Sequence, residues 1–471
     1  MNKHYDDAHF ENSNIQIRKG TARRTILRVS AIGLIFLPLH QVSSAVDDVT
    51  ELRELVLNLS NEVNQLRSEV ERLRMERLEL RESENIDRRN YAGDTIVDPV
   101  EISLKNVPNE MPNKVWDWYG MIKVDAFHDS ATTSTQEFPF WTLEGTEGIS
   151  ETDMTAKQSK LGLNFSEPSD VFGGKLTGKL ELDFFGNIAR PGNVGQNHAY
   201  QLRSRHVYLN WSNDQWSWLA GKTSQIYEVV VPETINAGYY RYQGRIGHRR
   251  LQANITRKLA IGNEGSLSIT GGIEEPVGTT HGGDLDNDGI DDATRSELPE
   301  FVSRLRYDFK GFGGHKSQIS FAGLYGEEEV FGKRYSSYGT VVGGMMPLTD
   351  WLQLKGTYWF GSNLDSAGAG IAQGINTIEE KAIESHGGWA QLKIKPGSHY
   401  WFNIGYSQDD PSDKDLNDGQ RSLNETTLVN SYLKLAESLT VGLEYFKVST
   451  SYKGGEKATN HRFQTSVMYK F

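Results

Sequence analysis

The sequence predicts an all-β transmembrane barrel of about 16 antiparallel strands, preceded by an N-terminal α-helical coiled coil. The last eleven residues, 461–471, alternate apolar and polar side chains and end on the aromatic Phe471. This period of two is typical of a strand with one apolar face. No run of eighteen apolar residues occurs anywhere in the chain. Strands, not helices, are therefore the expected membrane-crossing elements.

The composition excludes several classes of protein. Only 37% of the residues are hydrophobic and the mean hydropathy is −0.54, which is too polar for a bundle of membrane helices, whereas a barrel strand needs only about ten alternating residues. The absence of cysteine rules out disulfide frameworks and thiolate metal sites. A net charge of −12 argues against nucleic acid as a partner. No motif of a hydrolase, metalloprotease or phosphate-binding loop occurs, so we expect no enzyme and no required cofactor.

The N-terminus has the features of an export signal. Basic residues precede an apolar core at 29–39, which is followed by small residues ending at Ala45. This order predicts a signal peptide over residues 1–45. The alternative is an uncleaved signal anchor, although eleven apolar residues are too few to span a bilayer.

Residues 46–83 show heptad periodicity, with valine at a positions and leucine at d positions. Opposite charges flank the apolar positions, as in Glu62 with Arg67. The pattern predicts a parallel coiled coil that joins identical chains in the periplasm. Valine at a with leucine at d favours two strands, and a lone amphipathic helix on the barrel is the alternative to an oligomer. The apolar positions are Val49, Leu52, Val56, Leu59, Val63, Leu66, Val70, Leu73 and Leu80.

Residues 84–115 are predicted to form an irregular linker and residues 116–471 the barrel. Short turns such as 213–215 and 395–397 alternate with long polar loops such as 225–244 and 361–384. A barrel in the bacterial outer membrane shows this alternation, and an even strand number leaves both ends in the periplasm. A soluble β-domain, the alternative, has no reason to sort its loops by length. The sixteen strands are expected at 116–129, 154–165, 175–186, 199–211, 216–224, 245–258, 265–274, 300–309, 315–326, 334–346, 351–360, 385–395, 398–408, 422–435, 438–450 and 460–471.

A barrel of this size encloses an aqueous lumen, and alternation assigns many cations to its wall. Rings of arginine and lysine favour anions, so the sequence predicts a channel that prefers small anionic solutes. The alternative is that lumen acids such as Glu181, Asp183 and Glu444 neutralise these cations. Arg203 and Arg205 have outward parity, which places them near the outer end, at a subunit contact or beyond a bulge. The predicted pore-lining residues are Lys123, Lys160, Lys222, Arg250, Arg304, Arg306, Lys355 and Lys393.

Two outer loops carry further expectations. The loop at 225–242 either folds inward and narrows the pore or caps its mouth. The loop at 284–291 places oxygen ligands and a glycine at the spacing of the first half of a calcium loop, although position twelve is Arg295. It is expected either to bind a structural Ca²⁺ or to form a solvated acidic turn. Its ligands would be Asp284, Asp286, Asp288, the carbonyl of Ile290 and Asp291.

Three segments resemble recurring strand motifs of the DcaP-like trimeric outer-membrane porins. They are Tyr-Gly-Met-Ile-Lys-Val-Asp-Ala at 119–126, Thr-Ala-Lys-Gln-Ser-Lys-Leu-Gly at 155–162 and Leu-Arg-Ser-Arg-His-Val-Tyr at 202–208. The resemblance implies a homotrimer of sixteen-stranded barrels with a periplasmic coiled coil, embedded in outer-membrane lipid, that takes up small anions such as dicarboxylates. Lys157 and Lys160 stand where arginines are expected, and lysine lacks the bidentate fork of arginine. An envelope-tethering or adhesive protein that uses the barrel only as an anchor is the alternative function.

Overall fold

The computed structural model describes residues 116–186, 200–278, 285 and 292–471. The expected signal peptide, coiled coil and linker lie outside these residues, and so do all five expected calcium ligands. Within the described ranges, no helix has the length and apolar character needed to cross a membrane.

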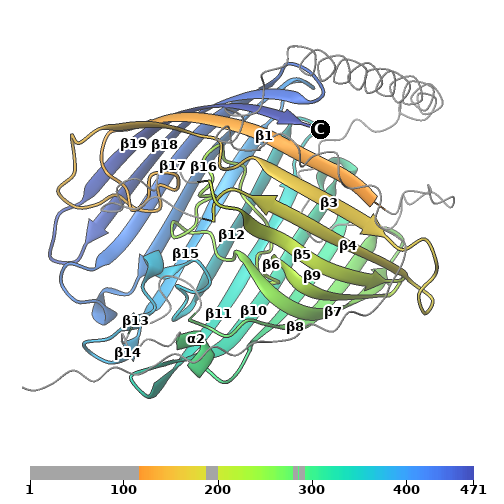
Figure 1. Cartoon of the computed structure of the whole chain (residues 1–471), viewed down its shortest axis with the longest axis horizontal. Coiled ribbons are helices and arrows are strands. Elements are labelled where there is room, and N and C mark those ends of the chain that lie inside the picture. Colours follow the sequence, from red (N-terminus) through yellow and green to blue (C-terminus); the bar gives the residue numbers. More distant parts are fainter. Residues whose placement is uncertain (1–115, 187–199, 279–284, 286–291) are drawn as a thin grey trace, which may run out of the picture. The chain divides into compact units, whose positions relative to one another are not determined.

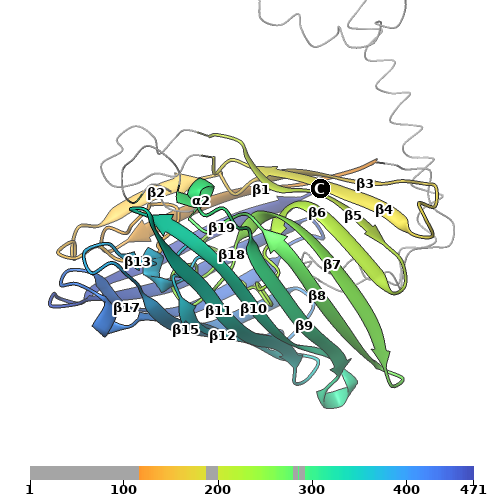
Figure 2. The ribbon, with the colours of Figure 1, turned by 90° about the horizontal axis from the view of Figure 1, so that it is seen from below.

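The described residues form a closed antiparallel barrel (Figures 1 and 2). Its sheet contains 17 strand segments, of which β2 (Glu151–Thr155) and β3 (Lys160–Ser166) both pair with β1 (Trp116–Asp129). These two segments are halves of one interrupted strand, so the described barrel has the sixteen strands that alternation predicts. Antiparallel pairing of β1 with β19 (Ala458–Lys470) closes the ring.

The remaining elements follow in chain order, and the strand bounds agree with the expected ones to within a few residues. Sequence reasoning missed the small β13–β14 hairpin and the short helices, which all lie in connections. The other strands are β4 (Lys175–Asp183), β5 (Arg203–Ser212), β6 (Trp216–Ser224), β7 (Arg249–Ile261), β8 (Gly265–Glu274), β9 (Glu300–Lys310), β10 (Lys316–Val330), β11 (Lys333–Pro347), β12 (Leu352–Ser362), β13 (Ile375–Asn376), β14 (Lys381–Ala382), β15 (Glu384–Ile394), β16 (Tyr400–Pro411), β17 (Arg421–Lys434) and β18 (Leu439–Tyr452). The helices are α2 (Asp292–Arg295), η3 (Phe312–Gly314), η4 (Gly370–Ala372) and η5 (Asp413–Asp415).

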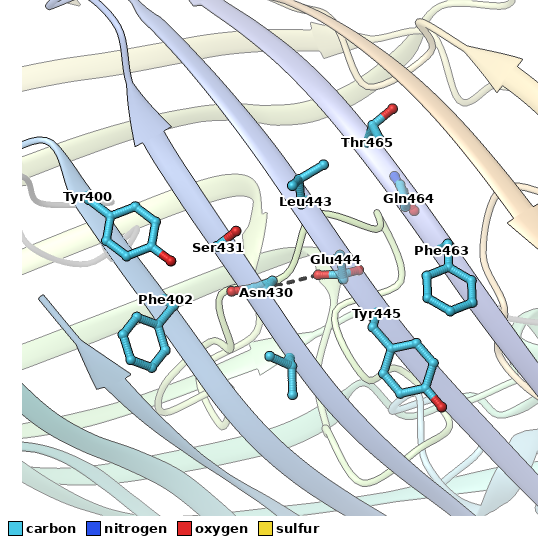
Figure 3. Close-up of a pocket in the computed structure, with 11 residues that line it drawn as sticks. Tyr400, Phe402, Asn430, Ser431, Leu443, Glu444, Tyr445, Phe463, Gln464 and Thr465 are labelled. Atoms are coloured by element: carbon cyan, nitrogen blue, oxygen red, sulfur yellow. Dashed lines mark hydrogen bonds between the residues drawn. The ribbon is translucent and has the colours of Figure 1, made fainter.

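The outer face of the barrel is apolar and its inner face is polar. Across β16–β19, aromatic and aliphatic side chains such as Leu443 and Phe463 project outward around a shallow groove (Figure 3). Their neighbours in sequence, Glu444 and Gln464, are buried on the inner face. This alternation is the arrangement that suits lipid outside and polar groups inside.

Candidate functional site

The loop at 225–248 folds into the lumen and crosses it. It leaves β6, and near its start the amide N–H of Ile226 donates to Glu274 of β8 (2.9 Å). Further along, the amide of Ile235 donates to Glu444 of β18 (2.5 Å), a strand on the other side of the ring. On the way back, Trp359 of β12 donates its indole N–H to the carbonyl of Gly244 (2.7 Å). The inward alternative for this loop is therefore confirmed, and the loop is called the constriction loop below.

One anchor of the constriction loop is Glu233, which is buried against β15 and β16. Its carboxylate lies 3.0 Å from the ammonium group of Lys393 and accepts a hydrogen bond from the indole N–H of Trp401 (2.6 Å). Its backbone N–H and carbonyl both bond to the side chain of Gln391 (2.9 and 2.8 Å). Although burial alone would raise the pKa of Glu233, the ammonium groups of Lys393 and Lys355 hold that pKa below its ordinary value.

A second anchor is the carboxylate of Glu444, which projects inward from β18. It accepts the backbone amides of Ile235 (2.5 Å) and Asn236 (2.9 Å). It also accepts the side-chain amides of Asn236 (2.7 Å) and of Asn430 (3.1 Å; dashed in Figure 3). Lys123 completes this attachment from β1 by donating to the carbonyl of Ile235 (2.5 Å). Charge-assisted bonds of this kind are about twice as strong as neutral ones, so the loop is firmly held to the wall.

Apolar packing fills the space between the constriction loop and the β9–β18 wall. The loop contributes Ile226, Val229 and Val230, and these side chains belong to one buried cluster with wall residues such as Val341 and Trp359. The loop at 363–383 adds Leu364, Ala367 and Ala369 to the same cluster. On this side of the lumen the wall arginines of β9, Arg304 and Arg306, are buried.

The opposite wall, formed by β3, β4 and β5, leaves cations in contact with water. The side chains of Lys160, Lys179 and Arg203 are 29%, 24% and 33% exposed. Their acidic neighbours, Glu181 and Asp183, are almost completely buried. The open part of the lumen is therefore bordered by cations and not by the acids between them.

The charges of this cluster do not balance. Arg205 contacts both acids, Glu181 at 2.6 Å and Asp183 at 2.9 Å, and Arg203 forms a fork with Asp183 (3.0 and 2.6 Å). Arg249 interacts electrostatically with the same group and contacts His206 at 3.4 Å. Two carboxylates thus face five cations, namely Lys160, Lys179, Arg203, Arg205 and Arg249. We refer to these five as the cation cluster.

A β-bulge brings Arg203 and Arg205 into the lumen. In the pairing of β4 with β5, Glu181 is opposite His206 while Leu182 is opposite Ser204, so Arg205 is the extra residue. A bulge shifts the residues beyond it to the other face, and both arginines reach inner-face acids. Of the three locations that outward parity left open, the one beyond a bulge is confirmed.

The other predicted pore-lining residues are distributed differently from the expectation. Lys160 borders the open lumen. Most of the others also lie on the inner face, and four of them contact an acid there: Lys123 contacts Asp125 (3.2 Å), Arg250 contacts Glu300 (3.4 Å), Arg306 contacts Asp308 (2.8 Å) and Lys393 contacts Glu233 (3.0 Å). Arg304 is 4% exposed. Lys355 lies opposite the buried Gln391 in the register of β12 and β15. For the paired residues, neutralisation by lumen acids describes the structure better than a free cationic wall.

The placement of Lys222 in the lumen is wrong. It pairs with Val207 of β5 and Leu251 of β7, and both of these side chains are exposed on the outer face. Directly opposed residues of an antiparallel pair share a face. The register of β6 runs without a shift from Trp216 to Ser224, so Lys222 faces outward with Trp216 and Trp218.

Comparison with known proteins supports this architecture. No protein-family model matches the chain and no curated protein sequence matches it. The crystal structure of the outer membrane channel DcaP of Acinetobacter baumannii superposes with a TM-score of 0.61 at 19% identity, covering 76% of this chain and 97% of that chain. This chain has the fold of the DcaP channel. The resemblance found in the sequence is thereby confirmed for the fold. An anion-selective porin from Comamonas acidovorans superposes with a TM-score of 0.48 at 10% identity, covering 76% of this chain and 99% of that chain.

Proposed function

We propose that this protein is an outer-membrane porin that lets small anionic solutes diffuse passively into the periplasm. The cation cluster carries this proposal. Five cations against two carboxylates leave an uncompensated positive charge where the constriction loop has narrowed the lumen. Positive charge at a narrow point lowers the cost of removing water from an anion and raises the cost for a cation.

Dicarboxylate-like organic acids are the solute class that suits this wall. The exposed cations occupy neighbouring strands, with Lys160 on β3, Lys179 on β4 and Arg203 on β5. A solute with two carboxylates can place one of them beside each of two cations, and it therefore gains more electrostatic attraction from this wall than an anion with a single charge. The lysine ammonium groups act as point charges without bidentate geometry, so we expect weak, rapidly reversible contacts that are compatible with passage.

The apolar outer face provides the contact with outer-membrane lipid. We further propose a homotrimer, assembled through the barrel and through the coiled coil predicted at 46–83. Diffusion of the solute through the barrel requires no chemical step, because the pore radius and the charge of the wall determine which solutes pass.

The test is the ratio of chloride to potassium permeability in planar bilayers. The double variant Lys160→Gln and Lys179→Gln removes two exposed cations from the open lumen, and we expect its ratio to fall toward one. Lys222→Gln removes the same kind of charge from the outer face and is the matched control, which should behave as the wild type. An unchanged ratio in the double variant, or an equal fall in the control, would contradict the role of the cation cluster.

A further inference from the structure

The constriction loop places one polar group, the hydroxyl of Tyr239, beside the cation cluster. This hydroxyl is 2.7 Å from the side-chain nitrogen of Gln158, which lies in the turn between β2 and β3. Lys160 of the cation cluster follows Gln158 by two residues. Tyr239 also interacts electrostatically with two arginines of the cluster, Arg205 and Arg249. The loop and the wall therefore meet at this hydroxyl.

The backbone of the loop holds Tyr239 in an unusual conformation. Tyr239 and Tyr240 have φ angles of 51° and 60°, in the left-handed region that residues other than glycine adopt uncommonly. Such conformations persist only where surrounding contacts impose them. Here the amide of Arg241 donates to the carbonyl of Gly238 (3.0 Å), and the amide of Arg245 donates to the carbonyl of Tyr240 (3.0 Å). The guanidinium group of Arg245 lies 5.7 Å from the centre of the Tyr239 ring, so the ring is held as well as the backbone.

The neighbours of the Tyr239 hydroxyl determine which way its hydrogen points. The side-chain oxygen of Gln158 accepts a hydrogen bond from the ammonium group of Lys123, and an ammonium group can only donate. The amide orientation of Gln158 is therefore fixed, and its NH₂ group donates to the oxygen of Tyr239. The hydroxyl hydrogen of Tyr239 is left without an acceptor among the contacts of the described residues. The guanidinium groups of Arg205 and Arg249, with which Tyr239 interacts, have no acceptor to offer.

Arg249 adds unused donors to the same place. Its Nε atom contacts His206 Nε2 at 3.4 Å. Within the described part of the chain, the ion pairs of Glu181 and Asp183 with arginine are made to Arg203 and Arg205 and not to Arg249. A guanidinium group has five N–H donors, so most of those of Arg249 are available. The side chains of Arg249 and Tyr239 are both partly exposed.

We propose that Tyr239 is a specificity-determining residue of the pore, which donates its hydroxyl hydrogen to a carboxylate of the solute while Arg249 supplies the opposite charge. This inference rests on the function proposed above. A carboxylate suits the pair because its two oxygens can accept from both groups at once. Chloride is a single acceptor and gains mainly from the charge. The cations thus favour anions over cations, and Tyr239 favours carboxylates among the anions.

The test measures two quantities for Tyr239→Phe in planar bilayers. The ratio of chloride to potassium permeability should remain that of wild type, because no charge is removed. The concentration of succinate, the probe dicarboxylate, that halves the chloride current should rise about tenfold, which corresponds to about 1.4 kcal/mol, because a hydrogen bond to a charged group is lost.

Tyr208→Phe is the matched control. Tyr208 is opposite Lys179 in the register of β4 and β5 and therefore faces the lumen. Its hydroxyl is not oriented by any hydrogen bond among the described contacts. The substitution removes the same group from the same wall, and succinate should block this variant as it blocks wild type.

Gln158→Glu tests the direction of the hydrogen bond. A carboxylate at position 158 accepts from Lys123 and also from Tyr239, so the hydroxyl hydrogen is used within the protein. The added negative charge weakens block by itself, and the comparison is therefore between Gln158→Glu and the double variant Gln158→Glu with Tyr239→Phe. These two variants carry the same charge, and succinate should block them equally.

The outcomes separate this inference from the proposed function. Equal block of wild type and Tyr239→Phe by succinate, no block of wild type, or an equal loss of block in Tyr208→Phe would overturn the inference while a chloride preference stands. A further loss of block in the double variant relative to Gln158→Glu would also overturn it. A wild-type channel without chloride preference would overturn the proposed function, and this inference with it.

Discussion

Replacing Glu444 with glutamine should loosen the constriction loop. In wild type each carboxylate oxygen of Glu444 accepts two bonds: Oε1 from the backbone and side chain of Asn236 (2.9 and 2.7 Å), and Oε2 from Ile235 and Asn430 (2.5 and 3.1 Å). In glutamine one of these oxygens becomes an NH₂ group, so two donors lose their acceptor whichever way the amide points.

The size of the effect follows from these contacts. A hydrogen bond to a charged group contributes about 1.5–3 kcal/mol, so the loss of two costs about 3–6 kcal/mol. Since about 1.4 kcal/mol is a factor of ten in an equilibrium, the population with a released loop should rise about 10²- to 10⁴-fold. The remaining anchors at Glu233 and the apolar cluster should keep release reversible.

Single-channel recording is the assay, because release of the loop widens the lumen for as long as it lasts. We expect Glu444→Gln to show larger current fluctuations and a higher mean conductance than wild type. Glu437→Gln is the matched control, since Glu437 is exposed in a turn and pairs only with Lys434 (2.7 Å) among the described contacts. If Glu444→Gln folds, as judged by heat-modifiable migration on gels, and its current trace equals that of wild type, the anchoring role is refuted.

Four further outcomes are expected. Because the pKa of Glu233 is held below its ordinary value of 4.5, the contribution of its charge to loop stability is complete above that value and is lost as the pH falls through the lower folded value. Current fluctuations should therefore increase as the pH is lowered below 4.5 in wild type but not in Glu233→Gln. Replacing Arg304 and Arg306 with Gln should change the ratio of chloride to potassium permeability less than replacing the exposed lysines of the cation cluster, because these two arginines are buried. Reversal potentials measure this ratio. Deleting Phe471, whose backbone exchanges two hydrogen bonds with β1 (2.9 and 3.1 Å), should lower the yield of heat-modifiable barrel. Deleting 47–80 should leave conductance intact, whereas a tethering protein would lose its function.

The barrel could be predicted from the sequence because its two faces meet different solvents. Lipid outside and polar groups inside impose a period of two on each strand, and the terminal segment ending at Phe471 shows this period clearly. The same rule places Lys222 outside, since it has the parity of Trp216 and Trp218 in an uninterrupted strand. The expectation that Lys222 lines the lumen therefore conflicts with the alternation of its own strand, which can be read from the sequence.

Other parts of the site depend on information that local sequence does not contain. Arg203 and Arg205 enter the lumen because of a bulge, and alternation alone does not reveal where an extra residue falls. The anchor of Ile235 is Glu444, which is 209 positions away, so only the closed ring brings them together. The inward fold of the constriction loop in turn determines which wall cations are covered.

The reversal potential of purified wild-type protein in a tenfold KCl gradient tests the central claim most directly. The sign of this potential reports whether chloride or potassium crosses the barrel more easily. A conducting, chloride-selective channel is the predicted result. A potassium-selective channel, or a correctly folded barrel that carries no current, would contradict the account.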